Sequence, residues 1–257
     1  MALAIDLSGT ATIVFGVANH RSIAWAIARH LHDAGARLTI TYQNARLAKN
    51  ALGLIAELDD ARAVECDVLD AASVDAAVEV ASADAPLASA VHSVAFANRE
   101  DMESDFSATG IEGFRVALEV SAYSLLPVAR ATSAKMPDGG SILTLTFHAA
   151  DKVYPGYNVM GVAKAALENE MKQLAAEYGR RGIRVNAISA GPLNTLAARG
   201  ISGFTNMQRV HAERSPLGRN ITQDEVGAAA AFLSSPLASG ITGHVLYVDA
   251  GYNVMGV

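Results

Sequence analysis

The sequence has 257 residues, 51% of them hydrophobic and 18% charged, and its 20 basic and 26 acidic side chains give a net charge of −6. At roughly 150 residues per domain, a chain of this length can bury a sizeable core without disulfides or metals. A mildly acidic chain lacks the basic surface that binding to a phosphate backbone needs, so nucleic acid is not expected as a partner.

Short apolar, β-branched runs alternate with helix-length segments along the whole chain. Such runs are typical of strands buried on both faces, and helix-length spacing between them implies right-handed βαβ crossovers. The pattern predicts a single α/β domain over residues 1–257, a doubly wound (Rossmann) parallel sheet of about seven strands with helices on both faces. The predicted strands are 12–17, 37–43, 62–68, 90–97, 141–147, 183–189 and 244–249. The predicted helices lie near 22–34, 45–58, 71–83, 111–131, 157–179 and 222–233.

The segment 191–222 interrupts this alternation, because it is long and contains several glycines and prolines. A connection of this length in a compact domain is usually functional. We expect it to be a substrate-covering loop after the sixth strand, with short helices of its own. The sequence GYNVMG occurs at 156–161 and again at 251–256. Only the first copy leads into a helix with a lysine, so we interpret the second as C-terminal packing.

Further features bear on the cellular compartment. Cys66 is the only cysteine, which excludes an intramolecular disulfide, and it is expected to be a small buried hydrophobic residue. The histidines do not occur at zinc-ligand spacing, so no metal is expected. The first residues carry Asp6 and no cationic segment, and no apolar run approaches the ~20 residues that span a bilayer. We therefore expect a cytoplasmic protein with no membrane partner.

The end of the first predicted strand is placed to hold a dinucleotide. Gly16 ends that strand, and Ser22 and Ile23 begin an apolar-periodic helix. In a doubly wound sheet a pyrophosphate binds to the free amides at this helix N-terminus. The loop GVANHRSIA is not a G-x-G-x-x-G motif, so by itself it is weak support. The Ser22 hydroxyl can either cap the helix or bond a phosphate oxygen.

Polar residues at the ends of the next two strands suit the adenosine of such a cofactor. Gln43 can bond the ribose hydroxyls, but it lacks the charge that would enforce NAD. Arg46, three residues on, is placed where it can reach a 2′-phosphate, although the balance favours NADH. Asp67 can accept a hydrogen bond from the adenine amino group, and a strand-end cap explains it equally well.

Tyr157 and Lys164 are the candidate catalytic pair. They are seven residues apart at the start of a predicted helix, and at ~100° per residue they fall on nearly the same face, two turns apart. A tyrosine hydroxyl with an ammonium behind it can donate a hydrogen bond to an oxygen on which charge develops. The alternative is a packed tyrosine beside a solvated lysine.

At this point the chain resembles the short-chain dehydrogenase/reductase superfamily. It is similar in particular to the NADH-dependent enoyl-acyl-carrier-protein reductases of bacterial type II fatty-acid synthesis. The six residues between Tyr157 and Lys164 are typical of this subgroup, whereas ordinary members of the superfamily have three. The resemblance covers essentially the whole chain and rests on GVANHRSIAWAIA, TYQN, CDV, HSVAFA, PGYNVMGVAKAALE, ISAGPLNTLAARGI and VDAGYN.

The resemblance implies a reductase with Tyr157 and Lys164 as its catalytic residues, NADH as cofactor, an acyl-carrier-protein thioester as substrate and a homotetrameric assembly. The substrate-binding residues that it implies are Ala97, Phe147 and Tyr157. The cofactor-binding residues that it implies are Gly16, Ser22, Ile23, Gln43, Asp67, Val68, Val94, Lys164, Leu193, Asn194, Thr195, Leu196 and Ala197. Among these, Thr195 would contact the pyrophosphate and the nicotinamide end.

Three features depart from the pattern of the family. Phe147 stands where many members have a second tyrosine, so the role of that hydroxyl is lost. Ala95 replaces a glycine of many relatives and narrows the pocket by a methyl group. Ser202, Thr205 and Asn206 replace basic residues thought to meet the carrier protein. Nearby arginines can supply that patch or be ordinary surface residues; they are Arg199, Arg209, Arg214 and Arg219.

Two other functions remain open at this level. A carbonyl or 3-oxoacyl reductase of the wider superfamily would share the fold, but the usual serine before the Tyr–Lys pair is not evident in TLTFHAADKVYPGY. A non-catalytic dinucleotide sensor would keep the binding loop and have no need of Tyr157.

Overall fold

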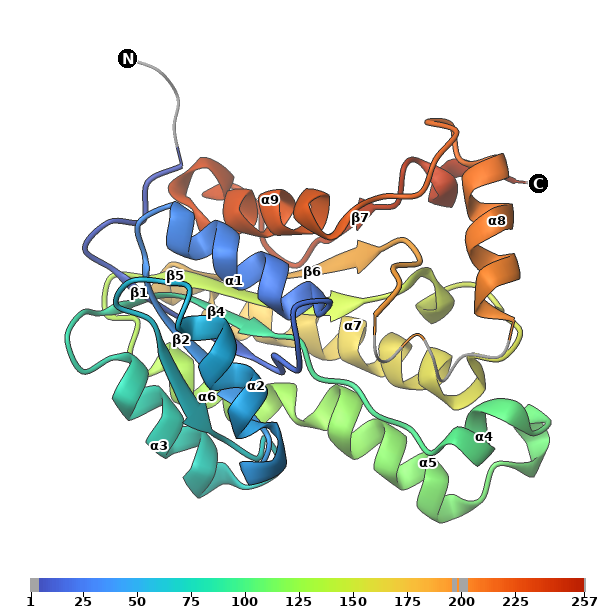
Figure 1. Cartoon of the computed structure of the whole chain (residues 1–257), viewed down its shortest axis with the longest axis horizontal. Coiled ribbons are helices and arrows are strands. Elements are labelled where there is room, and N and C mark those ends of the chain that lie inside the picture. The colour runs from blue at the N-terminus through green and yellow to red at the C-terminus, as the bar shows by residue number, and fades with distance from the viewer. Residues whose placement is uncertain (1–4, 196–197, 199–202, 257) are drawn as a thin grey trace.

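The computed structural model describes residues 5–195, 198 and 203–256. Within them, seven parallel strands form one sheet in the order β3-β2-β1-β4-β5-β6-β7, with helices on both faces (Figure 1). The strands are β1 (Ala11–Phe15), β2 (Arg37–Tyr42), β3 (Arg62–Glu65), β4 (Leu87–His92), β5 (Gly140–Thr146), β6 (Ile183–Ala190) and β7 (Val245–Val248). The helices are α1 (Ile23–Asp33), α2 (Ala45–Ile55), α3 (Ala71–Ala81), α4 (Arg99–Glu103), α5 (Ile111–Leu118), α6 (Leu125–Ser133), α7 (Asn158–Tyr178), α8 (Phe204–Arg214) and α9 (Gln223–Ser234). The doubly wound parallel sheet predicted from the sequence is confirmed.

The side chains of the central strands point alternately to the two faces of the sheet and so contribute to two separate apolar cores. In β1, Val14 faces the core formed with α1, α2 and α9, whereas Ile13 and Phe15 face the core formed with α3, α6 and α7. Successive strand side chains point to opposite faces, so a strand that must fill both cores is apolar at nearly every position. This two-sided burial is the reason that the strands were recognisable as continuous apolar runs.

The predicted fourth strand, 90–97, is displaced in the structure, where β4 ends at His92. Ser93 still donates its amide to the carbonyl of Phe15, but the chain then leaves the sheet. The Ser121 hydroxyl accepts from the Phe96 amide at 2.9 Å and donates to the Phe96 carbonyl at 3.0 Å. The apolar run is therefore continued as a loop held by a side chain instead of a neighbouring strand.

The predicted helix 111–131 is interrupted by a π-helical turn, η2 (Glu119–Tyr123), between α5 and α6. Pro127 lies in the first turn of α6 and has no amide to donate four residues back, so the regular ladder is broken at this point. The wider turn places Ser121 against the loop that follows β4. Single π-turns inside helices occur frequently at functional sites.

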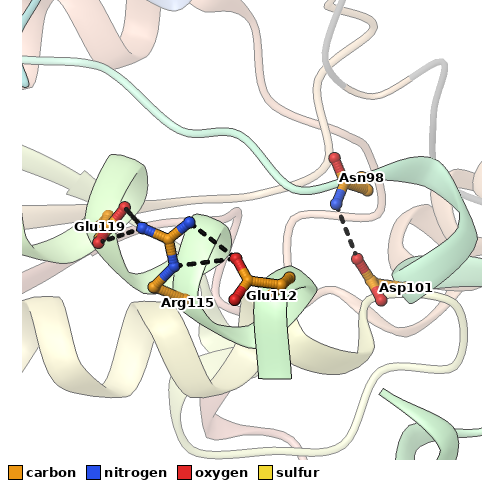
Figure 2. Close-up of polar contacts among 5 residues, drawn as sticks. All are labelled: Asn98, Asp101, Glu112, Arg115 and Glu119. Atoms are coloured by element: carbon orange, nitrogen blue, oxygen red, sulfur yellow. Dashed lines mark hydrogen bonds and ion pairs between the residues drawn. The ribbon is translucent and has the colours of Figure 1, made fainter. Parts of the chain in front are cut away.

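The short helix α4 was not predicted, and it closes against α5. A Cβ on Gly113 would lie 2.0 Å from the Asp101 carboxylate, so the two helices meet at van der Waals distance only because residue 113 is glycine. Figure 2 shows Asp101 bonded to Asn98, and Arg115 held between Glu112 and Glu119. The close approach at Gly113 holds α4 against α5, and α4 also packs against the long helix α7.

Part of the predicted loop 191–222 is helical in the structure, since α8 occupies Phe204–Arg214. Helix α9 begins with a capping box, in which the Thr222 side chain and the Glu225 carboxylate bond each other's backbone amides. Figure 1 shows α8 at one end of the molecule beside the C-terminal residues. No helix in the described ranges combines the length and the apolar composition needed to cross a membrane.

Candidate active site

The end of β1 can be occupied only by glycine. Gly16 has φ +90°, and a Cβ there would lie 2.2 Å from the Ser93 carbonyl oxygen. The backbones that leave β1 and β4 therefore approach each other without a side chain between them. Any larger residue would push them apart at the point where a doubly wound sheet binds its ligand.

Ser22 organises the loop that follows. Its hydroxyl oxygen accepts hydrogen bonds from the amides of Ala18, at 3.1 Å, and Asn19, at 3.0 Å. The side chain makes no capping bond to α1, so the interpretation of Ser22 as a side-chain helix cap is wrong. The first intrahelical donor is Trp25, which leaves the amides of Ile23 and Ala24 at the open end of the helix. Such a helix end attracts anions.

Gln43 and Asp67 follow β2 and β3 and are both exposed. One Asp67 oxygen accepts the Leu69 amide at 3.0 Å, a local turn that leaves the second oxygen for another partner. Beside Gln43, the buried Oδ1 of Asn44 has no hydrogen-bond partner within the described residues. Cys66 is buried as predicted, and burial raises the pKa of its thiol to about 11.

Tyr157 is presented by a tight turn. Its amide donates to the Tyr154 carbonyl over 3.1 Å, and Gly156 between them has φ +79°. Proline followed by glycine at the two central positions is the sequence of a type II turn. The turn ends at Tyr157, and α7 begins at the next residue.

The Tyr157 ring packs on an apolar wall. Its centroid lies 5.0 Å from that of Phe147, and the ring belongs to a small cluster that includes Ala97 and Met102. The three predicted substrate-binding residues, Ala97, Phe147 and Tyr157, are thereby brought to one place. Burial raises the pKa of the Tyr157 phenol, so the hydroxyl is protonated and able to donate at neutral pH.

Lys164 is buried, with 5% of its surface exposed, so the alternative of a solvated lysine is wrong. Its Nζ donates to the Leu145 carbonyl oxygen at 2.8 Å, and burial lowers its pKa to about 8. Leu145 and Phe147 lie at the carboxyl end of β5, so Tyr157, through Phe147, and Lys164, through Leu145, both contact this end.

Two ionisable groups near Lys164 were not identified from the sequence: the half-buried Glu168 and the buried His92. Glu168, one turn further along α7, accepts from the Thr146 hydroxyl at 2.7 Å, and burial raises the pKa of its carboxyl. His92 lies between the hydroxyls of Ser124 and Thr144, and burial lowers its pKa to about 3. A neutral His92 adds no positive charge beside Lys164. Both lie at the ends of segments already matched to the family, His92 in HSVAFA and Glu168 in PGYNVMGVAKAALE, but only the three-dimensional packing shows their surroundings.

The remaining predicted cofactor residues differ in their exposure. Val68 is buried in a core and Val94 packs against it. After β6, Leu193 is buried and Asn194 is exposed, while the Thr195 hydroxyl accepts the Ala198 amide at 3.2 Å. Leu196 and Ala197 lie outside the described residues, as do Arg199 and Ser202.

The arginines considered as a carrier-protein patch are partly neutralised within the chain. Arg209 is ion-paired with Glu213 at 2.7 Å, and Arg219 with Glu225 at 2.6 Å. Arg214 at the end of α8 is exposed. The positive charge of this face is therefore smaller than the count of arginines indicates.

In the second GYNVMG copy, Tyr252 packs as predicted, whereas Val254 and Met255 are exposed. Tyr252 stacks on His211 of α8, with ring centroids 4.5 Å apart, and its ring meets His148 edge-on. His148 bonds the Tyr154 hydroxyl at 3.1 Å, and Tyr154 packs on Phe147. A row of rings thus runs from the C-terminal tail to the wall beside Tyr157.

Comparisons with known proteins agree with this geometry. The enoyl-(acyl carrier protein) reductase family matches residues 16–253. Enoyl-acyl-carrier-protein reductase (NADH) FabI of Bacillus cereus is 47% identical over 97% of this chain and 99% of its own, and that of Bacillus subtilis is 45% identical over 97% and 98%. A crystal structure of the B. cereus enoyl-acyl carrier protein reductase with NADP+ and an indole naphthyridinone superposes with a TM-score of 0.95, at 45% identity, over 99% of this chain and 100% of that one. The reductase of Anaplasma phagocytophilum in complex with NAD gives a TM-score of 0.92 at 40% identity, over 99% and 95%.

Proposed function

The chain belongs to the enoyl-(acyl carrier protein) reductase family, and we propose that it reduces the carbon–carbon double bond of trans-2-enoyl-acyl-carrier-protein thioesters with NADH, the last step of fatty-acid elongation. The observation that carries this proposal is the convergence of Tyr157 and Lys164 on the carboxyl end of β5, from a helix that spaces them seven residues apart. The spacing and the relatives together favour this reaction over that of a 3-oxoacyl reductase.

The residues present suit the cofactor. The side-chain-free approach at Gly16 leaves room for a pyrophosphate against the open amides of α1, beside a loop shaped by Ser22. Gln43 and the second carboxylate oxygen of Asp67 can form hydrogen bonds with the adenosine. Lys164 can form hydrogen bonds with the ribose of the nicotinamide half. The other residues that we assign to the cofactor are Ile23, Val68, Val94, Leu193, Asn194, Thr195, Leu196 and Ala197.

The chemistry divides between cofactor and chain. NADH, when bound, supplies the hydride that adds to the β-carbon of the enoyl thioester. Tyr157 then donates a hydrogen bond to the thioester oxygen, where negative charge develops as the enolate forms. Because this charge is absent from the ground state, the interaction favours the transition state selectively.

Lys164 acts behind Tyr157. Its buried ammonium lowers the cost of negative charge nearby and holds the ribose hydroxyls that orient the cofactor. The bond to Leu145 fixes the ammonium without neutralising it, because a carbonyl carries no net charge. Lys164 therefore serves through its position and charge.

The substrate is held by Ala97, Phe147 and Tyr157, and we propose that residues 191–222 cover it and exclude water. Arg214 on α8 is an exposed cation that an acidic carrier protein can contact. We also propose a cytoplasmic homotetramer. The exposed apolar side chains of Ile111 and Tyr123, on α5 and η2, support a face covered by another copy. A monomer in sedimentation at micromolar concentration would refute that assembly.

Loss of NADH absorbance with a trans-2-enoyl thioester tests the function, run beside a 3-oxoacyl thioester and an NADPH control. Oxidation specific to the enoyl ester is expected. Activity on the 3-oxoacyl thioester alone would indicate a carbonyl or 3-oxoacyl reductase of the wider superfamily. Binding of NADH without turnover on carrier-protein thioesters of several chain lengths would favour a sensor.

A further inference from the structure

Asn158, the residue after Tyr157, has an unusual backbone conformation. Its φ is +36°, and within the described residues only Asp60 and Ala250 are other non-glycine residues with positive φ. An L-amino acid adopts this region at a cost and persists there only where its surroundings hold it. Asparagine tolerates the region better than most residues because its amide can bond nearby backbone.

The amide of Asn158 bonds a distant part of the chain. Its Nδ2 donates to the carbonyl oxygen of Ser104 over 2.5 Å, across 54 residues of sequence. Ser104 ends α4, and its own amide donates to the Glu100 carbonyl. The strained start of α7 is thus bonded to the C-terminal end of α4.

Helix α4 is itself held in place. Asp101 lies against Gly113 of α5 and is bonded to Asn98 at 3.1 Å (Figure 2). Met102 of α4 belongs to the same apolar cluster as Ala97 and Tyr157. The Ser104 carbonyl therefore lies at the end of a helix that packs on the Tyr157 cluster through Met102.

Tyr157 depends on this anchorage. Within the described part of the chain its hydroxyl makes no hydrogen bond, so the direction of the phenol is set by ring packing on Phe147 and by the backbone at 157 and 158. On the Tyr157 side the backbone bonds are short-range, from its amide to Tyr154 and from the Met160 amide to its carbonyl. Among the hydrogen bonds of the described residues, the one donated by the Asn158 amide links this turn to α4.

We propose that Asn158 is a positioning residue for the reaction: its left-handed backbone and its bond to Ser104 aim the Tyr157 hydroxyl at the substrate oxygen. This inference rests on the role proposed for Tyr157. Asn158 is assigned no contact with substrate or cofactor, and it acts entirely through Tyr157.

Three substitutions separate the two contributions of Asn158. Asn158→Gly keeps the left-handed backbone and removes the amide. Asn158→Asp keeps the size of the side chain and replaces the donor with an acceptor that repels the Ser104 carbonyl. Asn158→Ala removes the amide and the tolerance of positive φ. We expect kcat to fall at least tenfold in Asn158→Asp and Asn158→Ala and by less in Asn158→Gly. The KM for NADH should stay within twofold of the wild-type value in all three variants.

Arg99→Ala is the matched control, because it removes the exposed Arg99–Glu103 bond of the same helix α4, which takes no part in holding Asp101 or Asn158. It should leave kcat within twofold of wild type. The thermal midpoint of every variant is recorded, and if Asn158→Ala does not fold, the Gly and Asp variants carry the test. Equal loss of kcat in Arg99→Ala and Asn158→Asp would show a general structural effect and overturn the proposal.

A double-mutant cycle with Tyr157→Phe decides whether Asn158 acts through Tyr157. If it does, Asn158→Asp lowers kcat strongly in the wild-type background and by less than twofold in the Tyr157→Phe background. Losses that multiply in the double variant would overturn the positioning role. A Tyr157→Phe variant with wild-type turnover would instead refute the role proposed for Tyr157, so the two failures are distinct.

Discussion

The ammonium group of Lys164 is bonded to the Leu145 carbonyl oxygen, so the side chain that we assign to the cofactor ribose is anchored to the strand that carries the wall of the substrate site. The anchor is buried, and burial lowers the pKa of Lys164 to about 8. The charge that the mechanism uses is therefore present at neutral pH and lost within the alkaline range.

This pKa predicts the pH profile. As pH rises through about 8, Lys164 loses its proton, and kcat/KM for NADH should fall toward tenfold per pH unit, since kcat/KM reports groups of the free enzyme. Initial rates between pH 6.5 and 9.5 measure this. Lys172→Met, at an exposed position two turns further along α7, is the control and should keep the profile. A rate constant that stays flat to pH 9.5 would contradict the prediction.

Tyr157→Phe should lower kcat by about 10²–10³, the effect of losing one donor to a developing oxyanion, or about 2.7–4 kcal/mol. The NADH dissociation constant should change by less than about twofold, because the ring still packs on Phe147. Single-turnover kinetics and fluorescence titration with NADH check the two halves. Tyr154→Phe removes a hydroxyl bonded to His148 on the same wall and should cost far less turnover.

Gly16→Ala should lose both stability and NADH binding. The added methyl carbon would lie 2.2 Å from the Ser93 carbonyl oxygen, and alanine is strained at φ +90°. Gly9→Ala separates the two effects, because Gly9 has φ +75° with nothing within 4 Å of the added carbon. We expect about 1–2 kcal/mol of destabilisation from strain at Gly9 and a further ~1–3 kcal/mol from overlap at Gly16. Urea denaturation of both variants measures this, and equal losses would argue against the close approach.

The lowered pKa of the buried His92 predicts that the folded protein loses stability in acid. Its folded pKa of about 3 is far below the usual 6.5, so between these values the unfolded chain binds a proton that the folded chain does not. The free energy of unfolding should therefore fall as pH drops from 6.5 toward 3, by up to about 1.4 kcal/mol per unit from this group. His92→Gln should be less stable at pH 7 but lose less between pH 6.5 and 4.5. Parallel pH dependences for the two proteins would disprove this assignment.

The sequence predicts the architecture well because its signals are local. Both cores draw on the same strands, so apolar runs such as that of β1 are visible without tertiary information. The sequence predicted that the fourth strand ends later than β4 does. The backbone of Phe96 is hydrogen-bonded to the Ser121 hydroxyl instead of a neighbouring strand, and these residues are far apart in the chain. Ser22 shows the same limit at short range, since its position suits a cap but its hydroxyl turns back to the loop.

At the candidate active site, helical spacing and the motif that contains both residues predicted Tyr157 and Lys164 as a pair. The spacing carried no information on what lies behind them. The bond to Leu145, the buried His92 and the strained Asn158 arise from elements that meet only after folding. Residues whose role depends on such meetings have no sequence signature of their own.

The only thiol of the chain makes a natural reporter of breathing motions. Cys66 is 3% exposed and holds its proton at neutral pH, so an alkylating reagent can modify it only when the edge of the sheet at β3 opens. Its neighbour Asp67 is assigned to the adenine. The rate of thiol modification, followed with and without NADH, therefore measures how far cofactor binding suppresses opening at that edge, with no label added to the native protein.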